Sequence, residues 1–107
     1  IWNKRKYLID PHTAVAMNVL EQYRAETGDA TPALVASTAS PFKFGPAVLE
    51  ALGVAQPQQG QESIGQLAEF TGIAAPAPLV GLAGKRIRFS QTVEKDHMTD
   101  AVREMLL

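Results

Sequence analysis

The sequence predicts an α/β fold in which two helices flank a single buried strand. Three observations carry this prediction: an Asp-Pro pair opens a helical pattern at residue 11, residues 33–36 form a run that is apolar on both faces, and a Ser-Pro pair opens a second helical pattern at residue 41. Asp or Ser followed by Pro is typical of a helix start, because the polar side chain caps free N–H groups and Pro has none to leave unpaired. We therefore expect a helix-strand-helix unit, part of a three-layer sandwich with few strands.

The first helix is expected to run from Asp10 to Gly28, which is suited to end it in the left-handed conformation. Apolar residues recur along it at helical spacing: Val15, Val19, Leu20 and Tyr23. The strand at 33–36 fits a parallel sheet that is covered on both sides. A lone strand cannot pair its backbone groups, and the one other candidate is the alternating run at 86–92. We expect the remaining strands to belong to residues outside this chain.

The second helix is expected to start at Ser40-Pro41 and to close at Gly53. Residues 54–62 predict a loop, and residues 64–70 predict a short helix with Leu67 and Phe70 facing inward. Residues 74–78 predict a Pro/Ala connector that is not helical. Asp96 is expected to cap a last helix with an apolar stripe made of Met98, Ala101, Val102, Met105 and Leu106.

The composition limits the classes of protein. With 107 residues, a net charge of -1 and no cysteine, the chain is about one domain and has no disulfide, thiolate zinc site or thiol catalysis. No apolar run reaches the roughly 20 residues that span a bilayer, and a reducing cytoplasm is the default for a domain without disulfides. Because the chain starts at Ile1 rather than Met, we expect it to be part of a longer protein.

The residues with chemical potential are few. Ser37 and Thr38 follow the expected strand and precede a helix, where open α/β sheets hold ligands, although hydroxyls at such positions more often cap or form turns. His12 and His97 lie at helix starts without clustered carboxylates, so we expect no metal site. The basic residues 4–6 and Lys43 are expected to be solvated, and no catalytic triad or glycine-rich phosphate loop is present.

Two motifs together resemble one enzyme family. Residues 7–16, Tyr-Leu-Ile-Asp-Pro-His-Thr-Ala-Val-Ala, are similar to the segment that opens the C-terminal part of threonine synthases. Residues 37–44, Ser-Thr-Ala-Ser-Pro-Phe-Lys-Phe, resemble the family motif Ser-Thr-Ala-His-Pro-x-Lys-Phe, with Ser40 in place of histidine. Their order and spacing also agree, whereas residues beyond Gly53 resemble the family only in layout. The whole chain, 1–107, is thus expected to be a C-terminal portion of a threonine synthase and not a complete catalytic domain.

The resemblance implies a lyase of the fold-type II pyridoxal phosphate enzymes, which converts O-phosphohomoserine and water to threonine and phosphate. It implies that Thr38, or less favourably Ser37, faces the pyridine nitrogen of pyridoxal phosphate. It also implies that Asp10, Pro11 and His12 border the same pocket. The family's Schiff-base lysine and its cup for the cofactor phosphate lie in the N-terminal half, so this chain has no catalytic residue of its own. Lys43 matches the motif's own lysine and takes no catalytic role.

These implications predict that the chain alone is inactive and binds no pyridoxal phosphate. Its partners would be the N-terminal part of the same enzyme and, through the face left uncovered, a second copy of itself. The first alternative is a self-contained α/β binding or regulatory module, which would have a complete small sheet. The second is a small nucleic-acid binder that uses residues 4–6, which requires a basic face that a net charge of -1 does not supply.

Overall fold

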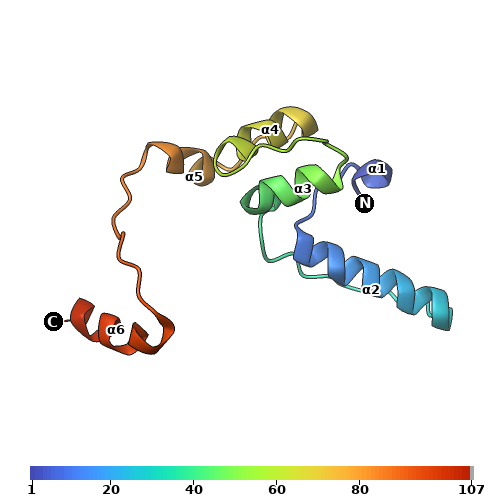
Figure 1. Cartoon of the computed structure of the whole chain (residues 1–107). Helices are drawn as coiled ribbons and strands as arrows, with labels where there is room; N and C mark the ends of the chain where they lie inside the picture. The colour runs from blue at the N-terminus through green and yellow to red at the C-terminus, as the bar shows by residue number, and fades with distance from the viewer. Residues whose placement is uncertain (107) are drawn as a thin grey trace.

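All the regular secondary structure in residues 1–106, the part of the chain that the computed structural model describes, is helical (Figure 1). The elements, in chain order, are α1 (Trp2–Arg5), α2 (Pro11–Thr27), the 3-10 helix η1 (Pro41–Phe44), α3 (Gly45–Ala51), α4 (Glu62–Thr71), α5 (Ala77–Val80), the 3-10 helices η2 (Gly81–Gly84) and η3 (Lys95–His97), and α6 (Met98–Leu106). No strand occurs within residues 1–106. The prediction of an α/β fold, a helix-strand-helix unit in a partial three-layer sandwich, is therefore wrong.

The missing sheet has a physical reason. Residues 33–36 and 86–92 have no regular secondary structure, and Leu34, in the run predicted to be a strand covered on both sides, is 96% exposed. A strand exists only when a neighbouring strand pairs its N–H and C=O groups. Neither segment finds that neighbour in the described part of the chain, so the local apolar pattern is present without the pairing that would make it a strand.

The prediction of the first long helix is confirmed. Asp10 caps α2 by accepting hydrogen bonds from the N–H groups of His12 at 2.9 Å and Thr13 at 3.4 Å, and Pro11 occupies the first helical position. Gly28 ends the helix in the left-handed conformation with φ of 71°, a backbone angle that suits glycine because it lacks a Cβ. Its apolar side chains, however, are exposed: Val15, Val19 and Tyr23.

The second predicted helix is present in two pieces. Ser40 caps it, since its hydroxyl accepts a hydrogen bond from the N–H of Phe42 at 3.3 Å. The first turn is the 3-10 helix η1, and α3 follows from Gly45 to Ala51. Pro46 explains the change, because it has no N–H to donate to the carbonyl of Phe42 four residues earlier, so the α-helical ladder cannot run through this point.

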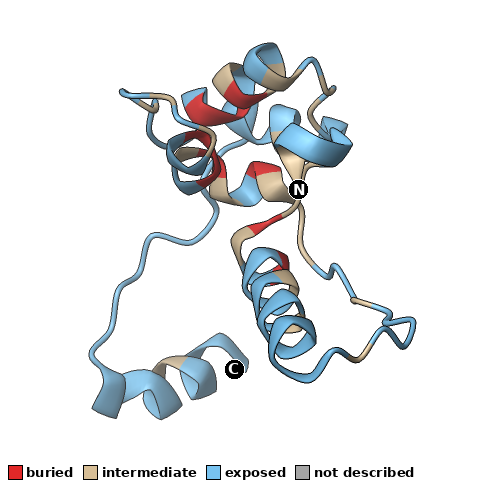
Figure 2. Ribbon diagram, turned by 90° about the vertical axis from the view of Figure 1, so that its right-hand side faces the viewer, coloured by how far each residue is buried: buried red, intermediate tan, exposed pale blue. Residues whose placement is uncertain are grey.

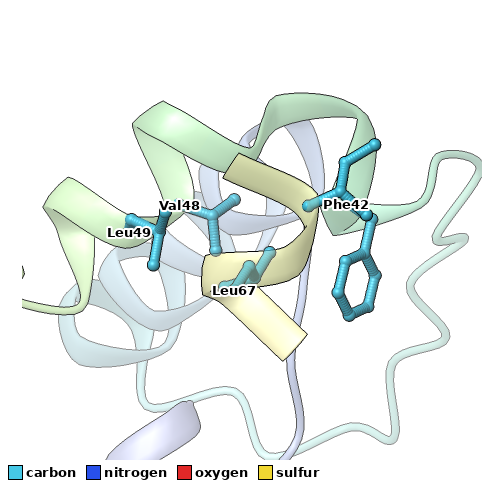
Figure 3. Packing of buried hydrophobic residues seen from close by; sticks show 5 residues of the cluster. Phe42, Val48, Leu49 and Leu67 are labelled. Atoms are coloured by element: carbon cyan, nitrogen blue, oxygen red, sulfur yellow. The ribbon is translucent and has the colours of Figure 1, made fainter. Parts of the chain in front are cut away.

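The core lies between η1, α3 and α4 (Figure 3). Its buried apolar members are Phe42, Val48, Leu49, Ile64 and Leu67. The backbones of α3 and α4 come close where Gly45 faces Ser63, because a Cβ on Gly45 would lie only 2.8 Å from the Cβ of Ser63. Leu67 is fully buried as expected, whereas Phe70 is 50% exposed, so only half of the inward-facing prediction for this helix is correct.

The rest of the chain extends away from this core (Figures 1 and 2). The Cα radius of gyration is 18.8 Å, compared with about 13 Å for a compact domain of this length. Buried residues gather in η1, α3 and α4, while α2 and α6 are exposed over almost their whole surface. The predicted last helix is present and begins at Met98, but Asp96 does not cap it, because Asp96 lies inside the turn η3. The apolar stripe of this helix is exposed. The connector at 74–78 is partly helical, contrary to expectation, because α5 begins at Ala77.

Across residues 1–106, no helix has the length and the apolar character that crossing a membrane requires.

Candidate functional site

The two sequence motifs meet at the N-terminus of α2. Thr13 lies in the first turn of this helix, and its hydroxyl is 3.2 Å from the hydroxyl of Ser37, which is 24 residues later in the sequence. A second contact joins the same regions, because the ring of His12 stands edge-on to the ring of Phe44 with 5.0 Å between the ring centroids. The middle of the first motif thus touches both ends of the second.

Asp10 is the centre of the polar network. Its side chain is only 1% exposed, and one carboxylate oxygen accepts hydrogen bonds from the N–H groups of His12 and Thr13. The Nδ1 atom of His12 lies 3.0 Å from that same oxygen. The other carboxylate oxygen accepts the hydroxyl proton of Thr13. A buried carboxylate with this number of donors is fully satisfied and held in one orientation.

The donors around Asp10 keep it ionised. The hydrogen bond from the Thr13 hydroxyl is the largest cause, and with the contacts from His12 it lowers the pKa of Asp10 to about 2, although burial acts in the opposite direction. Hydrogen bonds to the charged form of a carboxylate favour that form. Asp10 is therefore an acceptor, and not a donor, at any pH near neutrality.

A cavity of about 380 Å³ opens beside this network. Its lining is mainly apolar, with one basic and three hydroxyl side chains, and consists of Ile1, Arg5, Tyr7, Ile9, Thr13, Met17, Val35 and Ser37. Pockets of this size with a few fixed polar groups are typical of small-molecule sites. The cavity brings the hydroxyl of Ser37 to a surface that a ligand can reach.

Thr38 lies next to this pocket wall and is exposed. Within residues 1–106 the Thr38 hydroxyl has no hydrogen-bond partner. Of the predicted pocket border, Asp10 is buried, Pro11 is half-buried and His12 is exposed.

Thr13 is the site residue that sequence reasoning missed. It was part of the first motif, but nothing in its type distinguished it from the other hydroxyl residues. The available signal was its position three residues after Asp10, where a side chain of the first helical turn can reach back to the capping residue. Its burial, which makes its hydroxyl the link between Asp10 and Ser37, depends on the fold.

The other singled-out residues lie outside this network. Lys43 is exposed in η1, and His97 is exposed in η3 with its Nδ1 atom 3.7 Å from a carboxylate oxygen of Asp96. Within residues 1–106, no three His, Cys, Asp or Glu side chains are grouped so that they could hold a metal ion. The arrangement at α2 is therefore a wall of hydroxyls, with one buried carboxylate behind it, that can donate and accept hydrogen bonds.

Comparison with known proteins identifies the family to which this chain belongs. The family model described as "Threonine synthase, C-terminal" matches residues 13–105, and the chain therefore belongs to this family. The resemblance found in the two motifs is confirmed: the chain is a C-terminal segment of the threonine synthase family.

Individual relatives agree. The chain is 48% identical over 48 residues to threonine synthase of Corynebacterium glutamicum, a match that covers 45% of the chain and 10% of the relative. It is 40% identical over 62 residues to threonine synthase-like 1 of Mus musculus, covering 58% of the chain and 8% of the relative. The corresponding human protein is 40% identical over 53 residues, which cover 50% of the chain and 7% of that protein. The matched part thus spans a tenth or less of these relatives, and no solved structure matches the chain.

Proposed function

We propose that this chain forms one wall of the pyridoxal phosphate site of a threonine synthase, with the hydroxyl of Thr38 facing the pyridine nitrogen of the cofactor. The observation that carries the proposal is the contact between the two family motifs, in which Thr13 and Ser37 lie 3.2 Å apart. This contact anchors the segment that bears Thr38 to the start of α2. Asp10, Pro11 and His12 then border the same pocket, on the side of the helix N-terminus.

The polar groups of this wall fit a pyridine nitrogen. Thr38 offers a neutral, exposed hydroxyl, whereas the nearby carboxylate of Asp10 is buried and already accepts hydrogen bonds from His12 and Thr13. A hydroxyl can donate to an unprotonated ring nitrogen, while a carboxylate would hold a proton on that nitrogen. Pyridoxal phosphate, when bound, supplies the electron sink of the reaction, and the hydrogen bond from the protein tunes it.

The proposed reaction of the complete enzyme is the conversion of O-phosphohomoserine and water to threonine and phosphate, carried out in the cytoplasm. This chain contributes the hydroxyl wall, and the lysine that holds the cofactor comes from the preceding part of the enzyme. The chain is therefore not a complete catalytic domain. By itself it is expected to be inactive and to bind no pyridoxal phosphate.

The uncovered apolar surface supports a role as part of a larger assembly. Val15, Val19 and Tyr23 form an exposed stripe on α2, and Leu34 is 96% exposed in the segment that returns from this helix. A contiguous exposed apolar surface marks an interaction site. We propose that the preceding part of the enzyme covers this surface, and that the 107-residue chain alone self-associates. Sedimentation that shows a clean monomer with little binding of a hydrophobic dye would contradict this.

The self-contained module loses its main support. That alternative needs a complete small sheet, and residues 1–106 contain no strand. The nucleic-acid alternative gains none, because Lys6 lies over the ring of Trp2 at 5.4 Å within a single helical turn rather than on a broad basic face.

Substitution of Thr38 in the complete enzyme tests the proposal. Thr38→Val is expected to shift the absorption and emission maxima of bound pyridoxal phosphate and to lower kcat by roughly tenfold or more, because one charge-tuning hydrogen bond is lost. Thr38→Ser keeps the hydroxyl and should retain the spectrum. Thr92→Val is the matched control, because Thr92 is an exposed threonine between η2 and η3. This variant should change neither the cofactor spectrum nor kcat. An unchanged spectrum in Thr38→Val would overturn the proposal.

A second experiment tests the absence of a cofactor lysine from this chain. The 107-residue chain is incubated with pyridoxal phosphate, reduced with borohydride and examined by mass spectrometry. No stoichiometric adduct is expected, because Lys43, the lysine of the second motif, is an exposed side chain outside the polar network. A stoichiometric adduct on Lys43 would show that this lysine, and not one from the preceding part of the enzyme, binds the cofactor.

A further inference from the structure

The hydroxyl of Thr13 stands between two oxygen atoms and has one proton to give. It lies within hydrogen-bond distance of a carboxylate oxygen of Asp10 and, at 3.2 Å, of the hydroxyl oxygen of Ser37. A threonine hydroxyl donates one hydrogen bond and accepts up to two. One of the two contacts must therefore use the Thr13 proton, and the other must use a proton of the partner.

Asp10 determines which hydroxyl donates in each of the two hydrogen bonds. Asp10 receives the N–H groups of His12 and Thr13 on its other oxygen, so the whole carboxylate functions as an acceptor. Its pKa of about 2, lowered mainly by Thr13, leaves it without a proton near neutral pH. The Thr13 proton therefore goes to Asp10. The contact with Ser37 is then a hydrogen bond that Ser37 donates to Thr13.

This order gives the two neighbouring hydroxyls different properties. The proton of Ser37 is directed inward to Thr13, so its oxygen offers only lone pairs to the cavity that it lines. Thr38 is exposed and, within residues 1–106, its proton is not committed to another residue. Of the two residues, only Thr38 is free to donate.

We propose that Thr13 is a positioning residue: it directs the hydroxyl proton of Ser37 inward and so makes Thr38 the donor, and Ser37 an acceptor, toward whatever occupies the site. The identity of the occupant as pyridoxal phosphate rests on the proposed function, whereas the order of the protons does not. Asp10 and Thr13 are buried and Ser37 is exposed, so this chain of hydrogen bonds sets the polarity of the hydroxyl at its exposed end.

The hydrogen bond between Thr13 and Ser37 is tested first without a cofactor, in the 107-residue chain. Thr13→Val and Ser37→Ala each remove the same hydrogen bond, so the double variant should lower the urea midpoint of the helical circular dichroism signal no further than Thr13→Val alone. Thr13→Ser keeps the hydroxyl and should restore most of the loss. Additive shifts in the double variant would show that the two hydroxyls do not interact.

The direction of the chain is tested by Asp10→Asn in the complete enzyme. Asparagine is as good a helix cap as aspartate, so α2 keeps its start. Its amide nitrogen, however, can donate to Thr13, which frees the Thr13 proton for Ser37 and releases the Ser37 proton toward the cavity. Asp10→Asn should therefore return the cofactor spectrum of Thr38→Val at least half of the way to wild type. Adding Ser37→Ala to that pair should abolish the recovery.

The outcomes separate this inference from the proposed function. A cofactor spectrum that changes in Ser37→Ala and stays the same in Thr38→Val would overturn both the inference and the role proposed for Thr38. A spectrum that changes in Thr38→Val but does not recover in Asp10→Asn/Thr38→Val would overturn the inference and leave the proposed function intact. If the complete wild-type enzyme binds no pyridoxal phosphate, the proposed function fails, whereas the positioning role of Thr13 fails only if the cycle shows that Thr13 and Ser37 do not interact.

Discussion

The same substitution at two helical glycines should have opposite effects on stability. Gly45 begins α3, and a Cβ placed on it would lie 2.8 Å from the Cβ and 3.2 Å from the carbonyl carbon of Ser63 in α4. Ser63 is buried and its hydroxyl donates to the carbonyl oxygen of Gly60 at 2.6 Å, so its side chain cannot move aside without losing that bond. Gly65, two residues after Ser63 in α4, has no atom within 4 Å of the corresponding position.

The magnitudes follow from these distances. Gly→Ala in a helix gains about 0.5–1 kcal/mol because alanine loses less backbone entropy. Forcing an extra methyl group into a packed interface costs about 1–3 kcal/mol. Gly45→Ala should thus lower the free energy of unfolding by about 1–2 kcal/mol, whereas Gly65→Ala should raise it by about 0.5–1 kcal/mol. Urea unfolding followed by circular dichroism measures both. Equal stabilisation by the two variants would refute the close approach of α3 and α4.

Three further predictions concern the core, the site and the surface. Leu67→Ala should cost about 2–5 kcal/mol in the same urea assay, since Leu67 is fully buried, whereas Phe70→Ala on the half-exposed side of α4 should cost clearly less. The pKa of Asp10 is lowered to about 2, so the ionised form of Asp10 stabilises the fold. This stabilisation is complete above about pH 4 and is lost as the pH falls toward 2. When the helical circular dichroism signal is titrated with acid, the loss of signal in this pH range should be absent in Asp10→Asn. Val19→Lys should leave the unfolding midpoint of the 107-residue chain nearly unchanged, because Val19 is exposed. The same variant should weaken the self-association of this chain, measured by sedimentation.

Local chemistry made the helix starts predictable. The caps at Asp10 and Ser40 and the left-handed end at Gly28 each depend on residues within one turn of the helix. Such effects can be read from the sequence because no distant residue has to take part. The sheet could not be predicted in this way. The runs at 33–36 and 86–92 have the side chains of strands, but a strand depends on pairing with a segment elsewhere, and residues 1–106 supply none.

The site was predictable in its parts and not in its connections. Asp10, His12 and Ser37 were singled out from two motifs, and the structure brings the regions together through Thr13 and Phe44. Which hydroxyl is buried, and in which direction its proton points, depends on the path that the chain takes between Gly28 and Ser37. A turn fixes that path: Tyr23 donates to Asp29 at 2.9 Å, and Asp29 accepts the N–H of Thr31 at 2.8 Å. No pattern in the sequence marks this turn as part of the site.

The second motif joins the core to the site, and this explains the residue at position 40. Phe42 is buried in the core and Phe44 packs on His12, so the motif's later residues hold the segment in place while Ser37 reaches α2. Ser40 stands between them, and its hydroxyl accepts the N–H of Phe42 at 3.3 Å. Where the family motif has histidine, this chain therefore has a side chain that faces its own helix and not the cavity. Ser40→Ala should accordingly lower the stability of η1 by the loss of a cap, and Ser40→Asp, which restores a capping oxygen, should recover it without changing the hydrogen bond between Ser37 and Thr13.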